Sequence, residues 1–582
     1  MPSMRPPIMG TRHMVSAGHY LAAHAAFQIL ESGGNAIDAG VAAGIALGVT
    51  QTEKVSFGGV APIIIFKADT GKLISIDGLG VWPRRITPDY FMRHHGGKIP
   101  ATSIRSIVPA APDAWLTALE LHGTMSFGEV AAASIGFARD GFAMHALMSE
   151  FLKENEDSYK RYPTSYPVFF PNGRAPEPGE IWRQPDLART MQYMADEERA
   201  AASKAAGGAN GGAAARAAGL QAARDAFYKG DIASAIVKFH AESGGLMTAE
   251  DLADFRVRLE PTVSTTFAGI EMHCCGAWCQ GPVVPMTLNL LKGHDLEGYG
   301  HNSTRYIHVI TEALKLAFSD RHHFFGDPRF VDVPIDDLVS QAYADQRAAM
   351  IRPDRAWPEM PPPGDPRNQG DARLAPMPVP EPADKSPLGD TSYACVIDRH
   401  GNAFSVTPSD GSNNSPLVPG IGIVCSGRGT QSWADPRYRS SVGPGVRPRL
   451  TPNPSLALKD GKAFMTLGTP GGDVQCQAMV QVFLNVVLFG MDPQAAIEAP
   501  RFSSYSFPGS FEPHAYFPGQ LALEGRIEDT VEAELAALGH RTFWWDDYTW
   551  LAGAPCAIVV DPVTGVLSGG ADPRRPAYAL GW

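Results

Sequence analysis

The sequence lacks the marks of a secreted or membrane-spanning protein. Its 582 residues include seven cysteines, an odd number without the spacing of a disulfide framework. No uninterrupted apolar run reaches the roughly 18 residues of a transmembrane helix. No continuous apolar stretch with a small-residue cleavage site follows residues 1–7. We therefore expect a protein of a reducing compartment, the cytoplasm by default, without a membrane partner.

Positive charge is also scarce. Lys and Arg number 49 against 61 Asp and Glu, which gives a formal net charge of −12. This balance argues against nucleic acid as the main partner. With 44% hydrophobic residues, a chain of this length can bury a large core, either as several domains or as one large α/β unit.

Metal-binding patterns are incomplete. His322 and His323 are adjacent, so on a helix they would point apart, and no Glu completes a His-Glu-x-x-His pattern. We expect them at the surface or at a helix cap. Segment 273–279 holds one His and three Cys, but no second ligand pair follows at zinc spacing, which favours buried thiols in a strand and turn. We expect neither a metal nor a cofactor.

Helical and alternating patterns follow one another along the chain. Residues 15–31 predict a helix that ends at Gly33-Gly34, and a second, Ala-rich helix begins after Asn35. Residues 105–150 are mostly helical. Further strands are predicted at 63–66, 73–76, 391–398, 403–407, 421–425, 455–458, 464–467 and 556–560, and further helices at 474–489 and 527–538. This order predicts a layered α/β protein.

Two segments have the composition of irregular structure. Residues 195–223 are rich in Ala and Gly, with a Gly-rich centre, and are either a loosely held helix or a flexible surface insertion. Residues 358–390 are rich in proline, which disfavours regular structure. We interpret this second segment as an irregular linker that leaves the bond after it accessible.

The pair Asp390-Thr391 ends this linker and begins a predicted strand. A threonine hydroxyl is a weak nucleophile unless a base takes its proton. The α-amino group of the same residue can do so, because its ordinary pKa is about 7.7–8.0. Thr391 would supply both groups only after the bond to Asp390 is broken. Taken alone, the segment is better explained by an ordinary threonine at the start of a strand.

Five colinear stretches change that interpretation. They are Gly-Gly-Asn-Ala-Ile-Asp-Ala at 33–39, residues 244–252, Asp390-Thr391 with Gly401-Asn402-Ala403, Thr-Pro-Gly-Gly at 469–472, and Ala-Asp-Pro-Arg at 571–574. Together they resemble the γ-glutamyltranspeptidase family of N-terminal-nucleophile hydrolases. The resemblance implies a four-layer αββα sandwich. It also implies self-cleavage into a large chain, 1–390, and a small chain, 391–582, which interleave in one domain.

The resemblance also implies catalytic roles. Thr391 would be the nucleophile, and Ser409 stands where the family has a supporting threonine hydroxyl. The backbone N–H groups of Gly471 and Gly472 would stabilise the oxyanion, since paired glycines let the main chain approach a substrate closely. A plain strand-to-helix turn is the alternative for these glycines. Asp473 is expected either to contact substrate or to cap the following helix.

The departures from the family concern substrate binding. The family holds the glutamyl α-carboxylate with an Arg shortly after an Asp and with two serines after an Arg-Pro pair. Here Leu79 stands in place of that Arg, and Leu450 and Thr451 stand in place of the serines. A buried carboxylate without such partners is costly.

The groups that hold the α-amino group in the family are an Asn, a Gln and an Asp. By counting, Gly411, Arg428 and Gln431 take their places here, and Arg428 would repel an ammonium. We therefore expect an amidase or acylase whose small-molecule amide substrate carries an apolar or small acyl group. Arg428 leaves room for an acid group at another position.

Two alternatives are kept. One is a genuine γ-glutamyltransferase or glutathione hydrolase whose clamp is built from other residues. The other is an unprocessed, inactive binding protein. The expected partners are the two fragments of one precursor, and a homo-oligomer of such heterodimers is a further possibility.

Overall fold

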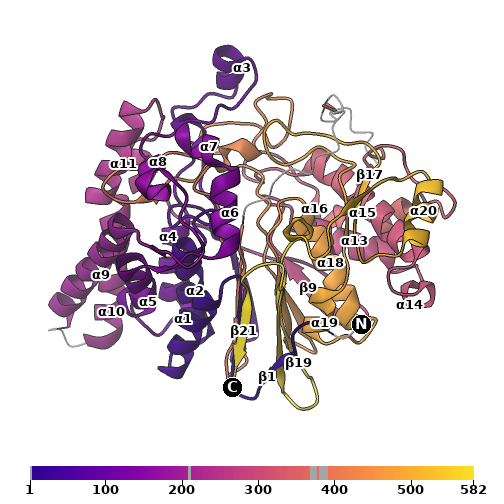
Figure 1. Ribbon diagram of the computed structural model, residues 1–582, viewed down its shortest axis with the longest axis horizontal. Helices are drawn as coiled ribbons and strands as arrows, with labels where there is room; N and C mark the ends of the chain where they lie inside the picture. Colours follow the sequence, from indigo (N-terminus) through magenta and orange to yellow (C-terminus); the bar gives the residue numbers. More distant parts are fainter. Residues whose placement is uncertain (1–2, 207–210, 368–375, 379–390) are drawn as a thin grey trace.

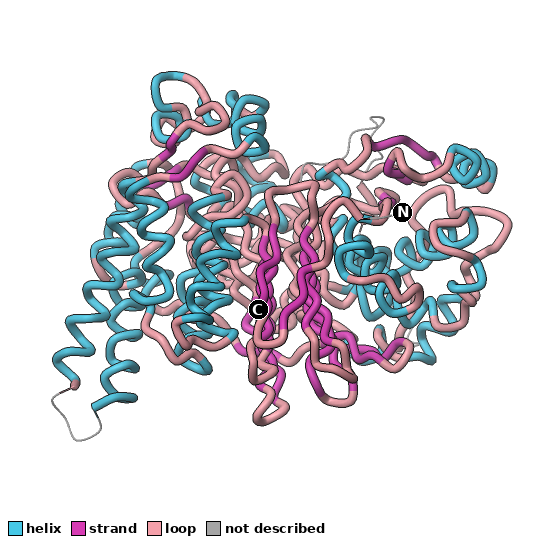
Figure 2. The backbone as a smooth tube through the Cα atoms, turned by 60° about the horizontal axis from the view of Figure 1, so that its bottom comes forward, coloured by secondary structure: helices cyan, strands magenta, loops and turns pink. Residues whose placement is uncertain are grey.

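The computed structural model describes residues 3–206, 211–367, 376–378 and 391–582. Two seven-stranded sheets pack face to face, and a layer of helices covers the outer face of each (Figure 1). Figure 2 shows the same order, with the strands in the middle and helices on both sides. The predicted four-layer α/β sandwich is confirmed.

Both sheets are built from strands on either side of position 391. The first sheet runs β21 (Tyr578–Gly581), β2 (Met14–Ala17), β10 (Ala394–Ile397), β11 (Ala403–Val406), β3 (Ile63–Lys67), β4 (Lys72–Ile76) and β7 (Leu259–Glu260). The second runs β1 (Ile8–Gly10), β20 (Leu567–Ala571), β19 (Cys556–Val560), β15 (Lys462–Gly468), β14 (Ser455–Lys459), β9 (Ile270–Cys274) and β8 (Val263–Phe267). A cut at position 391 would therefore leave two chains that share both sheets.

The helices form two layers. One holds α1 (Tyr20–Glu31), α2 (Ala36–Thr50), α4 (Ala111–His122), α5 (Phe127–Asp140), α9 (Pro185–Ala205) and α10 (Gly211–Tyr228). The other holds α13 (Val283–Leu291), α15 (Thr304–Phe324), α18 (Val474–Val487) and α19 (Pro493–Glu498). Helix α2 is buried along its whole length, which its small residues allow: a Cβ on Gly40 would lie 2.0 Å from the ring of Phe404.

The described chain also has four short 3₁₀ helices, at Ser103–Arg105, Pro171–Gly173, Arg428–Gln431 and Trp550–Ala552. The other α-helices and strands are smaller. They are α3 (Tyr90–His95), α6 (Ala146–Glu154), α7 (Glu156–Lys160), α8 (Tyr166–Phe169), α11 (Asp231–Glu242), α12 (Ala249–Ala253), α14 (Leu296–Tyr299), α16 (Ile335–Leu338), α17 (Gln341–Ala348), α20 (Asp529–Ala537), β5 (Phe142–Ala143), β6 (Ile181–Trp182), β12 (Leu417–Val418), β13 (Ile423–Val424), β16 (Phe502–Ser504), β17 (Gln520–Glu524) and β18 (Arg541–Trp545).

Two predictions near helix ends are wrong. Residues 14–17 are a strand and not the start of the first helix, because they pair with both β10 and β21. His322 and His323, expected at the surface or at a helix cap, lie in the last turn of α15 and are buried, and the C-cap is Phe325. Helix α15 has many polar residues, yet other parts of the chain cover it on all sides.

The Ala/Gly-rich segment is largely helical. Residues 195–205 belong to α9 and 211–223 to α10, and these helices lie side by side. Arg224 of α10 is buried and its Nε lies 2.6 Å from Asp113 Oδ1. A flexible excursion is therefore wrong for these residues, because alanine favours helix and one face packs on the neighbouring helices. The centre, 207–210, lies outside the described residues.

The described part of the proline-rich segment is irregular but firmly held. The Ser319 hydroxyl donates to the carbonyl of Pro361 at 2.7 Å, and Asp320 accepts from the N–H of Gly364 at 2.9 Å. The N–H of Met360 donates to the Tyr516 hydroxyl at 2.8 Å. The expected loose linker is thus a strap along α15 over its described first part. Residues 368–375 and 379–390, including Asp390, lie outside the described residues.

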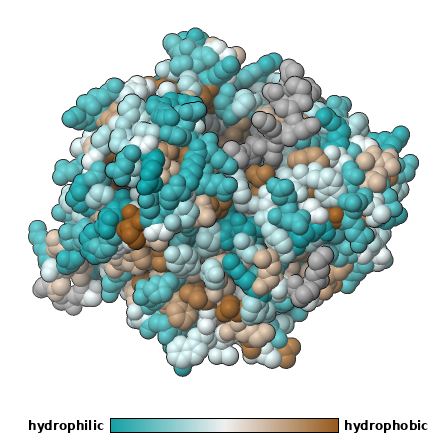
Figure 3. Space-filling view, viewed as in Figure 1, coloured by the Kyte–Doolittle hydropathy of each residue, from teal (hydrophilic) through white to brown (hydrophobic). Residues whose placement is uncertain are grey.

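Hydrophilic residues cover most of the face seen in Figure 3, with hydrophobic residues scattered among them. Within the described ranges, every helix is too short or too polar to cross a bilayer.

Candidate active site

Thr391 lies just ahead of β10 and is completely buried. Its Oγ1 lies 2.8 Å from Ser409 Oγ, and its carbonyl accepts a hydrogen bond of 2.8 Å from Arg575 Nη1. The φ angle of Thr391 is +149°, a conformation that residues with a side chain rarely adopt. Such conformations cost about 1–3 kcal/mol and gather at functional sites.

The β10–β11 hairpin brings the two hydroxyls together. In its antiparallel register Ala394 faces Val406, and the same register continued by three residues places Thr391 opposite Ser409. The contact between Thr391 and Ser409 therefore follows from the register of the hairpin. It could have been predicted from the sequence by extending the pairing of the two predicted strands.

Arg428 contacts Ser409 directly. Its Nη2 donates to Ser409 Oγ, and its Nε lies 3.3 Å from Asp410 Oδ1. A guanidinium can only donate, so Ser409 accepts from Arg428 and its own proton is free to point at Thr391 Oγ1. Arg428, expected to contact substrate, is here a partner of Ser409, the residue expected to support the nucleophile. Asp410, which the sequence analysis missed, holds it.

Gly471 and Gly472 connect β15 to α18. Their φ angles are +128° and +58°, which only glycine adopts freely, and the Gly472 carbonyl accepts from Gln280 Nε2 at 2.8 Å. The two glycines do lie in the expected turn between a strand and a helix. It does not exclude an oxyanion role, since that role needs the same backbone freedom.

Asp473 is not a helix cap. It stands at the N-cap position of α18, directly before Val474, but its side chain makes no capping hydrogen bond. It pairs with Arg321 of α15 and accepts from Ser510, through N at 2.8 Å and through Oγ at 2.6 Å. Burial raises the pKa of Asp473, while Arg321 and Ser510 lower it, and the net shift is downward. Asp473 is therefore an ionised, buried carboxylate.

Leu79 and Leu450 lie together in an apolar cluster. Both are fully buried, and the cluster includes Tyr393, Trp82 and Trp278. This cluster gives a carboxylate no partner.

Arg447, the arginine of the Arg-Pro pair, is not a free cation beside this cluster. Arg447 Nη1 lies 2.9 Å from Asp77 and 2.6 Å from Glu260, and its Nη2 lies 2.9 Å from Asp327. Its positive charge is therefore paired with carboxylates of the fold itself.

Gln431 and Thr451, expected to bind substrate, bind each other. Gln431 Nε2 donates to Thr451 Oγ1 at 2.7 Å. Gln280 Nε2 donates both to the Thr451 carbonyl, at 2.9 Å, and to that of Gly472. Gln280 therefore ties the segment at 451 to the glycine pair. The sequence analysis did not identify Gln280, because this residue lies in none of the stretches that resemble the family.

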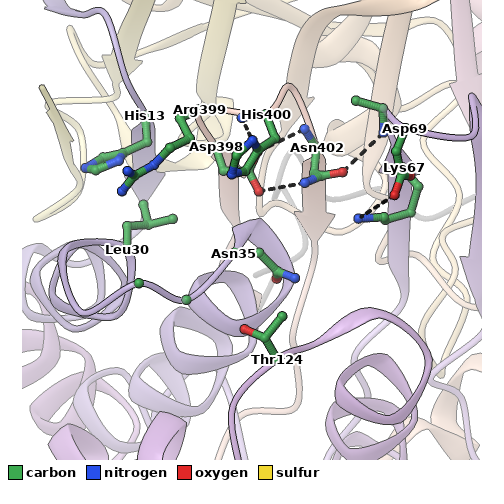
Figure 4. Close-up of a pocket in the computed structure, with 13 residues that line it drawn as sticks. His13, Leu30, Asn35, Lys67, Asp69, Thr124, Asp398, Arg399, His400 and Asn402 are labelled. Carbon is green, nitrogen blue, oxygen red and sulfur yellow. Dashed lines mark hydrogen bonds and ion pairs between the residues drawn. The ribbon is translucent and has the colours of Figure 1, made fainter.

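The 33–39 and 401–403 motifs meet at the opposite end of β10. Asp398 Oδ2 accepts from the N–H of Ala36 at 2.9 Å and from Asn402 Nδ2 at 2.8 Å. A cavity of about 670 Å³ opens beside them (Figure 4). Because Thr391 precedes β10 and Asp398 follows it, these motifs lie at the other end of the strand from Thr391 and stabilise the hairpin.

One group of possible metal ligands stands out within the described ranges: His308, Glu312 and His540, all buried. His308 Nδ1 already lies 2.9 Å from His540 Nε2, and Glu312 Oε1 lies 2.8 Å from the ammonium of Lys315. That ammonium opposes a second cation. Glu312 also accepts from the N–H of Trp357 at 2.9 Å, so the group anchors the strap.

Comparisons with known proteins agree along almost the full chain. A model of the γ-glutamyltranspeptidase family matches residues 22–582. The glutathione hydrolase-like YwrD proenzyme of Bacillus subtilis (strain 168) is 31% identical over 584 residues, which cover 99% of this chain and 100% of that protein. The Acylase ACY 1 proenzyme of Pseudomonas sp. (strain SE83) is 30% identical, covering 97% and 92%. The crystal structure of a cephalosporin acylase from Bacillus halodurans superimposes with a TM-score of 0.85 at 28% identity, covering 100% and 98%.

Proposed function

The chain belongs to the γ-glutamyltranspeptidase family, and from this premise we propose that it is an amide hydrolase that cleaves itself before Thr391 and then uses Thr391 as its nucleophile. The observation that carries the proposal is the 2.8 Å contact between the buried Thr391 and Ser409 hydroxyls. Relatives named as glutathione hydrolase-like and acylase proenzymes support both the amide chemistry and the processing.

In the self-cleavage step, Thr391 Oγ1 attacks the carbonyl carbon of the preceding residue, Asp390. The C–N bond breaks, the proton of Oγ1 passes to the amide nitrogen, which becomes the free α-amino group, and an ester to Oγ1 forms. Water then hydrolyses that ester and frees the Oγ1 hydroxyl and the main-chain carboxylate of Asp390. The strained φ of Thr391 favours this step, because breaking the peptide bond releases the constraint.

In each later turnover, the α-amino group of Thr391 takes the proton of Oγ1, which attacks the substrate carbonyl. The N–H groups of Gly471 and Gly472 stabilise the negative charge on oxygen. The C–N bond breaks, the amine leaves with the proton, and the acyl group stays on Oγ1. Water, or an acceptor amine, then releases it. Ser409 orients Oγ1 and donates to it.

We infer that the acyl group is not γ-glutamyl. Leu79 and Leu450 line an apolar cluster where the family has an arginine and a serine, and Arg447 is bound by three carboxylates. A genuine γ-glutamyltransferase or glutathione hydrolase is the second candidate, favoured by the name of the Bacillus subtilis relative. An inactive binding protein is the third, and the Thr391–Ser409 contact opposes it.

The two fragments would stay together, because the antiparallel pairs β10–β2 and β11–β3 cross the cut. An assembly of several heterodimers and a cytoplasmic location remain predictions.

The first test is the intact mass of the protein under denaturing conditions, with Thr391→Ala and Thr391→Ser beside it. We expect two fragments divided after Asp390, none from Thr391→Ala, and slow cleavage of Thr391→Ser, which keeps a hydroxyl. Amide hydrolysis should fall at least about 10³-fold in Thr391→Ala. An uncleaved chain that hydrolyses amides at the wild-type rate would contradict the mechanism.

A further inference from the structure

Arg428 stands at the end of a row of hydrogen bonds that leads to the nucleophile. Its Nη2 donates to Ser409 Oγ, which lies 2.8 Å from Thr391 Oγ1. That distance allows either hydroxyl to donate. Arg428 has no acceptor, however, so Ser409 accepts from it. Within the described ranges Thr391 Oγ1 is then the one acceptor that the Ser409 proton meets, and the bond runs from Ser409 to Thr391.

The direction of this bond matters for both proposed reactions, because each passes the Oγ1 proton to the nitrogen of Thr391 itself. An Oγ1 that donated to Ser409 would hold its proton away from that nitrogen, whereas an Oγ1 that accepts from Ser409 keeps its proton for the transfer. The accepted bond also stabilises the negative charge that develops on Oγ1 as the proton leaves. Arg428 strengthens this bond, because hydrogen bonds in a row polarise one another.

Asp410 fixes Arg428 from its other side. Arg428 Nε lies 3.3 Å from Asp410 Oδ1, and Asp410 accepts from Ser426 Oγ at 2.6 Å and from the N–H of Gly427 at 3.1 Å. Arg428 and Asp410 are each at most 1% exposed. The φ angle of Asp410 is +98°, a conformation that costs a residue with a side chain about 1–3 kcal/mol. The fold therefore holds this ion pair in one place at a cost, which is typical of a functional site.

We propose that Arg428, held by Asp410, is a positioning residue that makes Ser409 the donor and Thr391 Oγ1 the acceptor, and so directs the Oγ1 proton to the Thr391 nitrogen in self-cleavage and in amide hydrolysis. This inference rests on the proposed function and deepens it. By counting, the family has a glutamine in place of Arg428. A glutamine can donate or accept and leaves the direction open, whereas an arginine can only donate.

Self-cleavage separates this role from contact with the substrate, because it needs no substrate. The full chain is made by cell-free translation, and its intact mass under denaturing conditions is followed over time. We expect Arg428→Met to slow the cleavage at least about 10-fold. Arg428→Lys should recover part of the rate, because an ammonium also donates without accepting. A folded Arg428→Met chain that is cleaved at the wild-type rate would overturn the proposal.

Two further variants control for folding and for the loss of an arginine as such. Arg428→Met combined with Asp410→Asn removes both buried charges, and it should be cleaved as slowly as Arg428→Met while unfolding near the wild-type temperature. Arg437→Met is the matched control, because the Arg437 side chain is 72% exposed and pairs with Asp435. It should be cleaved at the wild-type rate.

A double-mutant cycle tests whether Arg428 acts through Ser409. Ser409→Ala alone should slow self-cleavage, and adding Arg428→Met to it should slow the reaction no further, because no hydroxyl is left to orient. If the two losses multiplied instead, Arg428 would act on folding or on the reaction by another route, and the proposal would be wrong.

The same measurement distinguishes failure of this inference from failure of the proposed function. A wild-type chain that stays at full length would refute the self-cleaving mechanism. A wild-type chain that is cleaved after Asp390, beside an Arg428→Met chain cleaved equally fast, would keep the proposed function and refute the role of Arg428.

Discussion

Leu450 and Arg449 are neighbours in the chain but belong to opposite environments. Leu450 belongs with Leu79 to the apolar cluster, whereas Arg449 donates to Ser510, whose hydroxyl donates to Asp473. The segment is extended where Leu450 bridges to Cys279, so successive side chains point to opposite sides. A shift of one position along this segment therefore moves a side chain from one environment to the other. The comparison teaches that two neighbouring residues of one extended segment can belong to an apolar and to a charged environment.

Removing the buried negative charge of Asp473 should have the largest effect. Asp473→Asn keeps the shape of the side chain but leaves Arg321 and Arg449 without an anion. We expect a loss of about 3–5 kcal/mol in the free energy of unfolding, measured by denaturant titration. The control is Asp435→Asn, because Asp435 pairs with the exposed Arg437. Equal stability of Asp473→Asn and the wild type would mean that Asp473 is not ionised.

Substitutions of Leu79 and Leu450 test the apolar cluster, the other region of the comparison. Leu79→Arg with Leu450→Ser restores the residue types that the family uses for the glutamyl carboxylate. Each hydrogen bond to a charged group contributes about 1.5–3 kcal/mol, so kcat/KM for a γ-glutamyl substrate should rise roughly 10–100-fold. The single Leu450→Ser variant is the control and should gain less. No gain in the folded double variant would refute the pocket assignment.

Glu53 adds a third environment to the comparison, because it is a buried carboxyl without a strong partner. Both its oxygens lack a hydrogen-bond partner among the described residues, and burial raises its pKa to about 7, although Lys54 lowers it. Because the folded-state pKa exceeds the unfolded one, the folded protein binds the extra proton. Its stability should therefore fall as pH rises from about 4.5 to about 7.

Glu53→Gln should remove that part of the pH dependence. We expect it to stabilise the protein at pH 8 by roughly 1–2 kcal/mol relative to wild type and to have little effect at pH 4. Unfolding temperatures across this range measure the difference. If the difference in stability between Glu53→Gln and wild type were the same at pH 4 and at pH 8, Glu53 would be ionised at both pH values.

Local patterns predicted the layers and the hairpin but not the surroundings of α15. The sequence predicts His322 and His323 at the surface or at a helix cap, because neighbours on a helix point apart and no metal-binding pattern is complete. The strap buries the polar face of α15, since its irregular backbone needs hydrogen-bond partners and Ser319 and Asp320 supply them. A periodicity search cannot see this, because an irregular, proline-rich segment shows no pattern of its own.

The sequence by itself determined the α/β layering, a threonine just ahead of a strand, and the presence of Leu79 and Leu450 where the family resemblance leads one to expect an arginine and a serine. These depend on local periodicity and on motifs that a single stretch contains. Only the tertiary structure decided which charges meet. Arg321 and Asp473 are 152 residues apart, and Arg449 and Ser510 are 61 apart. Such contacts depend on how the sheets and helices pack, and burial alone turns these ordinary surface residue types into a charged site.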